Sequence, residues 1–157
     1  MKVLVRRAGR RDLDGIHARW LRLREAEAKA DARFAPSKNA DPIARDHREL
    51  ILADPRTAFF VAEERGELAG FLHAQIDQND PSYELERYGR LVDVYVDETR
   101  RRQGVGTALL RCCVEWFASL GVREYRVRTP IAHPDARTFF ERACATVVST
   151  TLTARVE

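Results

Sequence analysis

Hydrophobic positions in this chain recur with two different periods, and the changes of period mark the predicted elements. Apolar residues three or four positions apart predict helices, whereas alternating or β-branched stretches between turn residues predict strands. The predicted helices span residues 12–29, 41–54, 105–120 and 134–143. The predicted strands span residues 2–6, 57–63, 68–77, 91–96, 124–128 and 146–156, the last being a strand or a hairpin.

Capping and turn residues delimit several of these elements. Asp12 is expected to be the N-cap of the first helix. Asp41 and Pro42 open the second helix with a capping carboxylate and a proline at the first helical position. Gly66 marks a hairpin turn, and Gly121 closes the third helix. Because strands and helices alternate in the second half of the chain, we expect a mixed sheet with helices on both faces.

Composition narrows the class of protein. The chain has 157 residues, of which 45% are hydrophobic and 32% charged. This is typical of one globular domain, so we treat residues 1–157 as a single domain. The longest apolar run, 58–62, is far shorter than the ~20 residues of a membrane span, and the N-terminus does not resemble a secretory signal. The three cysteines include the adjacent Cys112 and Cys113 and predict no disulfide framework. We therefore expect a cytoplasmic protein without a membrane partner.

The charge pattern argues against two further kinds of site. Lys and Arg total 27 and Asp and Glu total 24, which gives a net charge of +3. The basic residues are spread along the chain and are not interleaved with aromatic residues, which disfavours a nucleic-acid-binding module. No spacing among the four histidines and three cysteines matches a metal site, so we expect no metal.

One segment carries a specific chemical signal. The strand predicted at 91–96 leads into a polar turn, and the sequence Arg-Arg-Gln-Gly-Val-Gly-Thr at 101–107 then opens the third helix. Gly104 and Gly106 leave the backbone open to a ligand, and the first amides of a helix, with its dipole, favour an anion. The segment predicts a phosphate or pyrophosphate site; the alternative is a tight turn with solvated arginines. It is neither a P-loop nor a dinucleotide motif, because no Gly-Lys-Ser/Thr is present and Leu109 replaces the third glycine.

The pattern Arg101-x-x-Gly104-x-Gly106 resembles the acyl-CoA-binding signature of the GNAT superfamily of N-acetyltransferases. The resemblance covers nearly the whole chain. Residues 5–14 resemble the family's first strand and helix, 60–71 its second and third strands, and 133–142 its last helix. The resemblance implies an α/β (α+β) fold, with a GNAT-like mixed, mostly antiparallel sheet of six to seven strands, a central splay, and helices on both faces.

The same resemblance implies how acetyl-CoA binds. The pyrophosphate is expected on the backbone of residues 101–107. The pantetheine is expected to pair with backbone groups near Val94 and Val96, where a bulge splays the strand 91–96 from the strand 124–128. The residues implied in binding acetyl-CoA are Val94, Tyr95, Val96, Arg101, Arg102, Gln103, Gly104, Val105, Gly106, Thr107, His133 and Phe140.

Three positions depart from the family pattern. His133 replaces the Asn that usually begins the last helix, and Cys144-Ala145 replaces the usual Gly-Phe near its end. Phe140 stands where the family often has the Tyr that protonates the departing thiolate. Tyr95 or water is then the candidate acid. Because a thiol has a pKa of about 8.5, its anion is a tolerable leaving group, and the missing Tyr weakens the mechanism without excluding it.

The candidate residues of the acceptor side are carboxylates, a histidine and a tryptophan. Asp93 is the first choice for the base, because a carboxylate inside an apolar strand must face a partner or a cleft. The alternative is a structural carboxylate bonded to Arg or a backbone amide. His73 is the second candidate base. Glu84 and Glu86 are expected on a loop beside the site, either binding a cationic amine or merely solvated, and Trp20 is either a wall of the acceptor site or a core residue.

These inferences predict an N-acetyltransferase. It would move an acetyl group from acetyl-CoA to a primary amine of a small molecule or peptide, by direct attack in a ternary complex. The alternative is a GNAT-like domain that binds acyl-CoA without catalysis, suggested by Phe140. A homodimer rests on the family resemblance alone.

Overall fold

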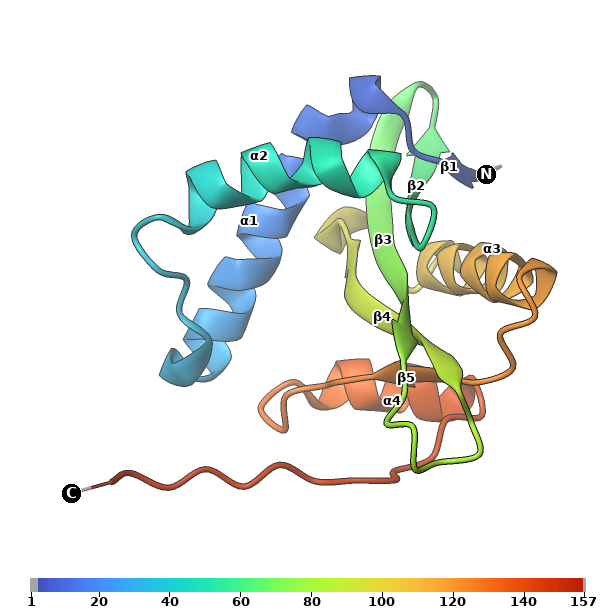
Figure 1. Ribbon diagram of the computed structural model, residues 1–157. Helices are drawn as coiled ribbons and strands as arrows, with labels where there is room; N and C mark the ends of the chain where they lie inside the picture. Colours follow the sequence, from blue (N-terminus) through green and yellow to red (C-terminus); the bar gives the residue numbers. More distant parts are fainter. Residues whose placement is uncertain (1–2, 157) are drawn as a thin grey trace.

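The computed structural model describes residues 3–156 and is built on a sheet that runs through the middle of the molecule (Figure 1). Its strands are β1 (Leu4–Arg7), β2 (Thr57–Glu64), β3 (Glu67–Gln78), β4 (Arg87–Val96) and β5 (Tyr125–Val127). They lie side by side in chain order. Each of the first four is antiparallel to the next, and β5 is parallel to β4. The predicted mixed, mostly antiparallel sheet is confirmed.

Helices cover both faces of this sheet, as the sequence predicts. They are α1 (Leu13–Ala30), α2 (Ala40–Ala53), α3 (Val105–Ser119) and α4 (Pro134–Arg142), with short 3-10 turns η1 (Arg10–Asp12), η2 (Ala32–Phe34) and η3 (Glu98–Arg100). In Figure 1, α1 and α2 lie on one side of the sheet and α3 on the other. None of the helices within residues 3–156 has the length and apolarity needed to span a bilayer.

The sheet separates two apolar cores, because neighbouring residues of a strand point to opposite faces. On the side of α1 and α2, Phe59 and Phe71 are buried together with Ile16. On the side of α3, Phe60 is buried with Leu109. Burying a side chain of this size contributes about 1.5–3 kcal/mol, so these two layers hold the helices against the sheet.

The sheet has five strands and not the six to seven that the resemblance implies. The segment 146–156, expected to be a final strand or hairpin, pairs with no strand among the described residues. In Figure 1 it runs as an extended chain to the left of the view, and its Leu152 is 92% exposed. Alternation of apolar and polar residues makes a segment compatible with a sheet, but a strand also needs a neighbouring strand for its backbone hydrogen bonds. The outermost strand, β5, has only three residues and offers a short edge for such pairing. Residue 2, placed by the sequence at the start of the first strand, lies outside the described residues.

The three cysteines are free thiols in different surroundings. Cys113 is fully buried in the core beside α3, and burial raises its pKa to about 12. Burial also raises the pKa of the neighbouring Cys112, which is half-buried. Cys144 follows α4 and is exposed. A thiol with a raised pKa carries little thiolate at neutral pH, so neither cysteine of α3 is prepared to act as a nucleophile.

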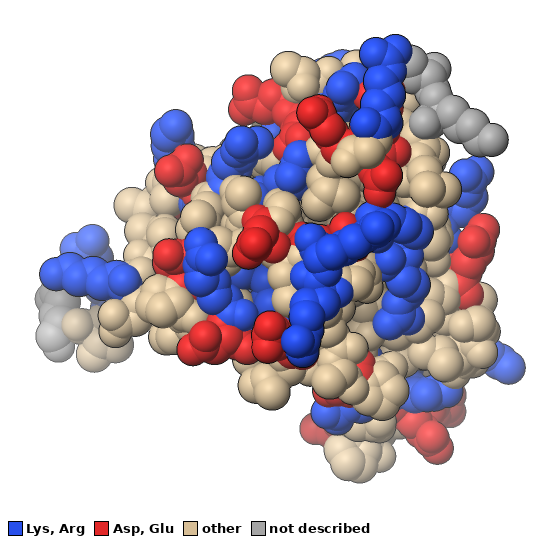
Figure 2. Space-filling view, turned by 90° about the horizontal axis from the view of Figure 1, so that it is seen from above, with Lys and Arg blue, Asp and Glu red and all other residues tan. Residues whose placement is uncertain are grey.

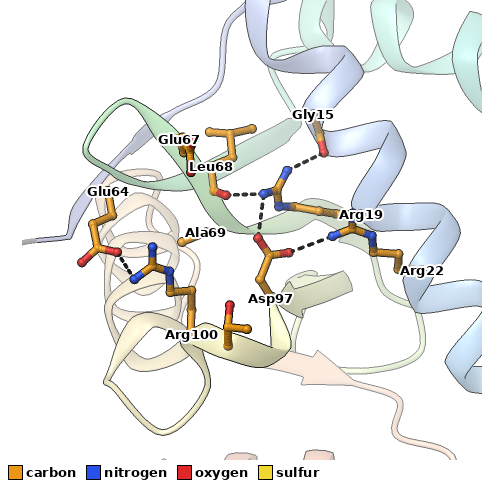
Figure 3. Close-up of a pocket in the computed structure, with 10 residues that line it drawn as sticks. Gly15, Arg19, Arg22, Glu64, Glu67, Leu68, Ala69, Asp97 and Arg100 are labelled. Atoms are coloured by element: carbon orange, nitrogen blue, oxygen red, sulfur yellow. Dashed lines mark hydrogen bonds and ion pairs between the residues drawn. The ribbon is translucent and has the colours of Figure 1, made fainter.

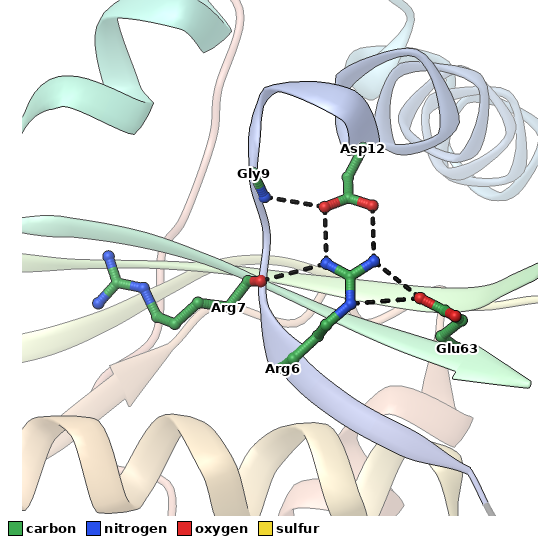
Figure 4. Close-up of polar contacts among 5 residues, drawn as sticks. All are labelled: Arg6, Arg7, Gly9, Asp12 and Glu63. Carbon is green, nitrogen blue, oxygen red and sulfur yellow. Dashed lines mark hydrogen bonds and ion pairs between the residues drawn. The ribbon is translucent and has the colours of Figure 1, made fainter. Parts of the chain in front are cut away.

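A charged cluster fixes the start of α1 on the sheet (Figure 4). Asp12 occupies the N-cap position, but its side chain makes no capping bond, contrary to the sequence prediction. Arg6 on β1 donates to both carboxylate oxygens of Asp12, at 2.8 and 2.9 Å, and the same guanidinium donates to Glu63 on β2 at 2.7 Å. The amide of Gly9 donates to Asp12 at 2.8 Å. The carboxylate is drawn away from the helix because a bidentate ion pair is stronger than a neutral amide cap.

This cluster generates a prediction about stability. The Asp12→Asn variant loses the ionic fork to Arg6, and we expect its free energy of unfolding at pH 7 to fall by about 1–3 kcal/mol. The hydrogen bond from Arg6 lowers the pKa of Asp12. The stabilisation is therefore complete above about pH 4 and is lost as pH falls through the lowered pKa. Urea unfolding of both proteins across this range measures it.

The matched control is Asp46→Asn, which changes an exposed carboxylate of α2 and should leave the free energy of unfolding within about 0.5 kcal/mol of the parent. If Asp12→Asn is as stable as the parent at pH 7, the fork contributes nothing in solution. A difference between parent and Asp12→Asn that does not shrink in acid would mean that the carboxylate charge is not its cause.

Candidate active site

An extra residue in β4 shapes the candidate site. Along the β3–β4 ladder His73 faces Asp93, but the next pair is Ala74 with Leu91. Val92 therefore has no partner of its own on β3 and forms a β-bulge, a distortion that frequently lies beside active sites. The bulge implied by the family resemblance is present in the strand where it was expected.

The bulge changes which side chains of β4 reach which face. In a regular strand Leu91, Asp93 and Tyr95 would all point to the same side. In this strand Leu91 is buried on the side of α3, whereas Tyr95 is buried on the side of α1 and α2. Asp93 is buried on the same side as Tyr95, opposite His73. One inserted residue thus brings a carboxylate to the face that α1 and α2 cover.

The pairing of β4 with β5 stops in the middle of β4. The last pair is Leu91 with Val127, so residues 92–96 have no strand neighbour on that side within residues 3–156. β5 ends at Val127, and β4 continues beyond it with an open edge, at the place where the family resemblance puts the central splay.

The open edge of β4 carries the backbone groups expected to bind pantetheine. The Tyr95 carbonyl faces β3, since a Cβ built on Gly70 of β3 would lie 2.6 Å from its oxygen. Successive residues of a strand direct their N–H and C=O groups to opposite sides. Val94 and Val96 therefore direct theirs away from β3, towards the space left by β5. The carbonyl of Val96 accepts a hydrogen bond from Arg101 Nε at 3.1 Å.

The loop after β4 presents backbone amides at the start of α3. The first intrahelical bond of α3 runs from the Ala108 amide to the Gly104 carbonyl at 2.9 Å, so the amides of residues 105–107 precede the helical ladder. Gly104 has φ = 80°, and a Cβ there would meet no described atom within 4 Å. A Cβ on Gly106 would approach the ring of Phe139 to 3.3 Å. Gly104 thus suits a left-handed backbone, and Gly106 leaves room for the Phe139 ring. Unpaired amides at a helix start are groups that can bind an anion.

The charged side chains of the loop are partly committed to protein contacts. Arg100 forms an ion pair with the buried Glu64 of β2. Arg101 is held by β4, whereas Arg102 is exposed and adopts a left-handed backbone with φ = 59°. Gln103 donates to a loop carbonyl at 3.0 Å. Arg101 and Arg102 are both exposed, and Arg102 is the one of the three consecutive arginines without a side-chain contact among the described residues.

A network of arginines anchors the loop to α1 from behind (Figure 3). Asp97, directly after β4, accepts a hydrogen bond from Arg19 at 2.7 Å and forms an ion pair with Arg22 at 3.5 Å. Arg19 also donates to the carbonyl of Gly15 at 3.1 Å. These residues surround a cavity of about 510 Å³ that also reaches Arg100. The network ties the end of β4, and with it the glycine loop, to the first helix.

A second and larger cavity lies beside the buried Asp93. It is a groove of about 960 Å³ between α1, α2 and strands β2 to β4. Asp93 lines it and forms an ion pair with Arg24 of α1, which also contacts Glu27. His73 lies on the other side of Asp93, with Nδ1 3.9 Å from Oδ2. His73 packs against Phe59 with ring centroids 4.4 Å apart, and its Nε2 is buried without a hydrogen-bond partner.

An aromatic ring and two guanidinium groups form the wall opposite the sheet. The guanidinium carbons of Arg24 and Arg48 lie 5.3 and 4.9 Å from the ring centroid of Trp20. His17 stacks against Trp20 with centroids 6.0 Å apart. Arg48 contacts His17 Nδ1, and Asp41 contacts His17 Nε2. Burial lowers the pKa of Arg48 to about 10, which still leaves it charged at neutral pH.

The structure brings some of the predicted acceptor residues together and leaves others apart. Trp20, His73 and Asp93 all line the groove. Glu84 and Glu86 are exposed on the loop between β3 and β4 and take no part in the groove wall of the described residues. They are thus separate from the other three candidates. The sequence analysis did not identify Arg24 and Arg48.

The predicted residues of α4 are also placed. His133 precedes α4, and its Nε2 lies 3.2 Å from the carbonyl of Ala26 in α1. Phe140 is 6% exposed and belongs to the core beside α3. The neighbouring Phe139, and not Phe140, is the ring that approaches Gly106. The apolar surroundings of Phe140 account for a phenylalanine at this position.

Ionisable side chains are spread over the surface of the molecule. Figure 2 shows Lys and Arg side chains interspersed with Asp and Glu over the face seen from above. Within residues 3–156, no three His, Cys, Asp or Glu side chains are grouped so as to hold a metal ion.

Sequence comparison identifies the family of this bulged, splayed α/β architecture. The model of the Acetyltransferase (GNAT) family matches residues 20–145, which include the second half of α1, the glycine loop and α4. The chain belongs to the GNAT family. The match begins at Trp20 and thus covers both the groove wall and the glycine loop.

Individual relatives agree with this assignment. The mycothiol acetyltransferase of Amycolatopsis mediterranei (strain U-32) is 36% identical over 83 residues, which make up 48% of this chain and 28% of the relative. This chain therefore spans little more than a quarter of that relative's length.

Solved structures of GNAT-like proteins superpose over almost the whole chain. A tetramutant of the BH1408 protein from Bacillus halodurans has a TM-score of 0.87 at 16% identity, covering 98% of this chain and 99% of that one. A predicted acetyltransferase from Clostridium acetobutylicum, solved with acetyl-CoA, has a TM-score of 0.78 at 16% identity, covering 98% and 96%. At these identities the likeness concerns the fold.

The close approach of β3 to the end of β4 generates a second prediction. In Gly70→Ala the new Cβ would lie 2.6 Å from the Tyr95 oxygen and 3.2 Å from Val96 Cα, both backbone atoms. The strands must separate at the edge of the splay, and we expect a loss of about 1–3 kcal/mol in the free energy of unfolding, measured in urea. In the control Gly9→Ala the Cβ would lie 4.0 Å from its nearest neighbour, and stability should be unchanged. Equal stability of the two variants would contradict the close approach.

Proposed function

We propose that this GNAT protein transfers the acetyl group of acetyl-CoA to a primary amine bound in the groove beside Asp93. One observation carries the proposal: the bulge in β4 opens a gap for a thioester on one edge of the strand and places a carboxylate in the groove on its face. Donor and acceptor could then meet at β4. The Clostridium acetobutylicum relative solved with acetyl-CoA supports the choice of donor.

The donor site is assembled from the backbone of β4 and α3. The pyrophosphate lies against the amides of the loop and first helical turn, where Gly104 and Gly106 leave access. Arg102 adds charge from solvent. The pantetheine extends along the open edge of β4 at Val94 and Val96. A strand amide at this edge is placed to stabilise the oxyanion that forms on the thioester carbonyl.

The reaction is a direct acyl transfer. The acceptor arrives as an ammonium ion, and Asp93 binds it and accepts one proton, directly or through a water molecule. The amine nitrogen then attacks the thioester carbon, a C–N bond forms, and the C–S bond breaks. The nitrogen then loses its second proton, and the thiolate takes up one proton, so that the products are an N-acetyl amine, coenzyme A and the proton held by Asp93. The ion pair with Arg24 holds Asp93 in position during this step.

The proton for the thiolate does not come from α4 in this chain. Phe140 has no hydroxyl and is buried in apolar surroundings. Tyr95 is on β4 itself, two residues after Asp93, and is the side-chain candidate, with water as the alternative. Because thiolates are good leaving groups, the acid contributes at the low end of the roughly 10²–10⁴ range of general acid–base catalysis.

The burial of Phe140 also favours a second candidate function. A chain with the acyl-CoA cradle but without the usual tyrosine would bind acyl-CoA and not turn it over. Incubation with acetyl-CoA and a panel of primary amines, with detection of free coenzyme A thiol, separates the two functions. Thiol release that depends on the amine supports transfer, whereas binding without release supports the second function.

The donor site can be tested without knowledge of the acceptor. Acetyl-CoA binds the folded state and should raise the melting temperature, while NAD should not. In Gly104→Val the branched side chain would occupy the path of the phosphates, and the shift should disappear. Gly66→Val is the matched control, because Gly66 also has a left-handed backbone (φ = 83°) with open space around a Cβ. It should lower the melting temperature similarly and keep the shift.

No shift in the parent at saturating acetyl-CoA would remove the donor assignment. An unchanged shift in Gly104→Val would place the phosphate site elsewhere.

The base is tested by Asp93→Asn, which preserves shape and removes the proton acceptor. We expect kcat to fall by about 10²–10⁴, with the shift caused by acetyl-CoA retained as the measure of an intact donor site. Glu84→Gln changes an exposed carboxylate outside the groove and should not alter kcat. If Asp93→Asn is as fast as the parent, the base is another group, and His73→Gln is the next variant to measure.

A further inference from the structure

Arg48 is buried in the acceptor groove without an acidic partner. It is 5% exposed and lines the groove from α2. Its only hydrogen bond within residues 3–156 runs from Nη1 to His17 Nδ1. A guanidinium has donors only, so His17 Nδ1 must be the acceptor and the ring proton must lie on Nε2, which donates to Asp41. The immediate partner of Arg48 is therefore a neutral ring and not a carboxylate.

The other arginines of the groove are neutralised locally. Arg24 pairs with Asp93. Arg56 pairs with Asp54 at 3.0 Å. Arg90 pairs with Asp77 at 2.7 Å. Each of these acids also lines the groove, so Arg48 is the groove guanidinium that forms no direct ion pair with a carboxylate among the described residues.

A buried charge without a counter-ion is costly to maintain. Burial lowers the pKa of Arg48 to about 10, although the nearby carboxylates of Asp93 and Asp41 oppose this shift. The side chain is nevertheless held firmly, between the ring of Trp20 at 4.9 Å and the His17–Asp41 pair. The remaining nitrogens of a guanidinium held in this way are free to form the fork that binds carboxylate or phosphate.

We infer that Arg48 binds an anionic group of the acceptor, so that the substrate is a primary amine that also carries a carboxylate or a phosphate. The inference rests on the proposed function. Arg24, which contacts Asp93, and Arg48 lie over the same Trp20 ring, so the amine at Asp93 and the anion at Arg48 are neighbours in the groove. The acceptor's negative charge replaces the missing protein carboxylate.

The inference is tested with matched pairs of amines. Amino acids are compared with their amides, and phosphoethanolamine with ethanolamine, by measuring kcat/KM for acetyl transfer. A charge-assisted contact to a buried guanidinium should favour the anionic member of a pair by about 10- to 100-fold. Comparison of the amino-acid pairs with the phosphoethanolamine pair shows whether Arg48 binds a carboxylate or a phosphate.

Variants then assign the preference to Arg48. Arg48→Gln should remove the preference. It should lower kcat/KM for the amines that carry a carboxylate or phosphate, mainly by raising KM, and leave kcat/KM for the amines without such a group little changed. Arg48→Lys should retain part of it, because the charge remains but the fork is lost. Arg45→Met, one turn earlier on α2 and exposed, should keep it in full. The melting-temperature shift with acetyl-CoA verifies that each variant is folded.

The outcomes separate this inference from the proposed function. The role of Arg48 is overturned if amines with and without an anionic group have equal kcat/KM, or if the preference survives in Arg48→Gln. Either result leaves the proposed acetyl transfer unaffected. If no amine is acetylated, the proposed function fails. In that case, calorimetric titration of the CoA-saturated protein with acetate and with inorganic phosphate tests whether Arg48 binds an anion. Binding that is lost in Arg48→Gln supports the anion site, and no binding to the parent overturns it.

Discussion

The register of β4 against β3 shifts at Val92, and the remaining geometry of the site follows from that shift. Before the bulge, β4 is held on both edges and sends Leu91 into the core beside α3. After it, the strand has lost its neighbour on one edge and turns Asp93 and Tyr95 towards α1 and α2. The open edge of β4 and the groove on its face thus begin within two residues of each other, the edge where β5 ends and the groove carboxylate where the bulge turns Asp93.

Local sequence patterns were enough to locate most of the fold, because amphipathic periods and turn residues act within a few positions. They did not determine which segments find a neighbour. Residues 146–156 alternate like a strand, yet a strand requires a partner that no local pattern specifies. Asp12 looks like a cap, but its carboxylate accepts from Arg6 on β1, and the same guanidinium also binds Glu63 on β2, 57 positions away along the chain.

The same distinction explains which candidate residues the sequence could name. The glycine loop could be placed at the start of α3 because its glycines and the helix start are contiguous in the chain. Asp93 could be named as a groove residue because a carboxylate inside an apolar strand must face a partner or a cleft. Its partner Arg24 lies 69 positions away, and no spacing rule links them. Arg48 left a weaker signal, since it lies four residues after Ala44 and three before Ile51, on the side of α2 that faces the groove.

The unequal burial of the three cysteines has a practical consequence. The proposed reaction releases the thiol of coenzyme A, which a thiol reagent can detect. The protein's own cysteines would react with the same reagent and add a background signal. Cys113 and Cys112 are protected by burial and by raised pKa values. Cys144 is the exposed one, which also makes it a single attachment point for a fluorophore. A dye placed there would sit at the end of α4, the helix whose Phe139 ring borders the glycine loop, and would report donor binding by fluorescence without any knowledge of the acceptor.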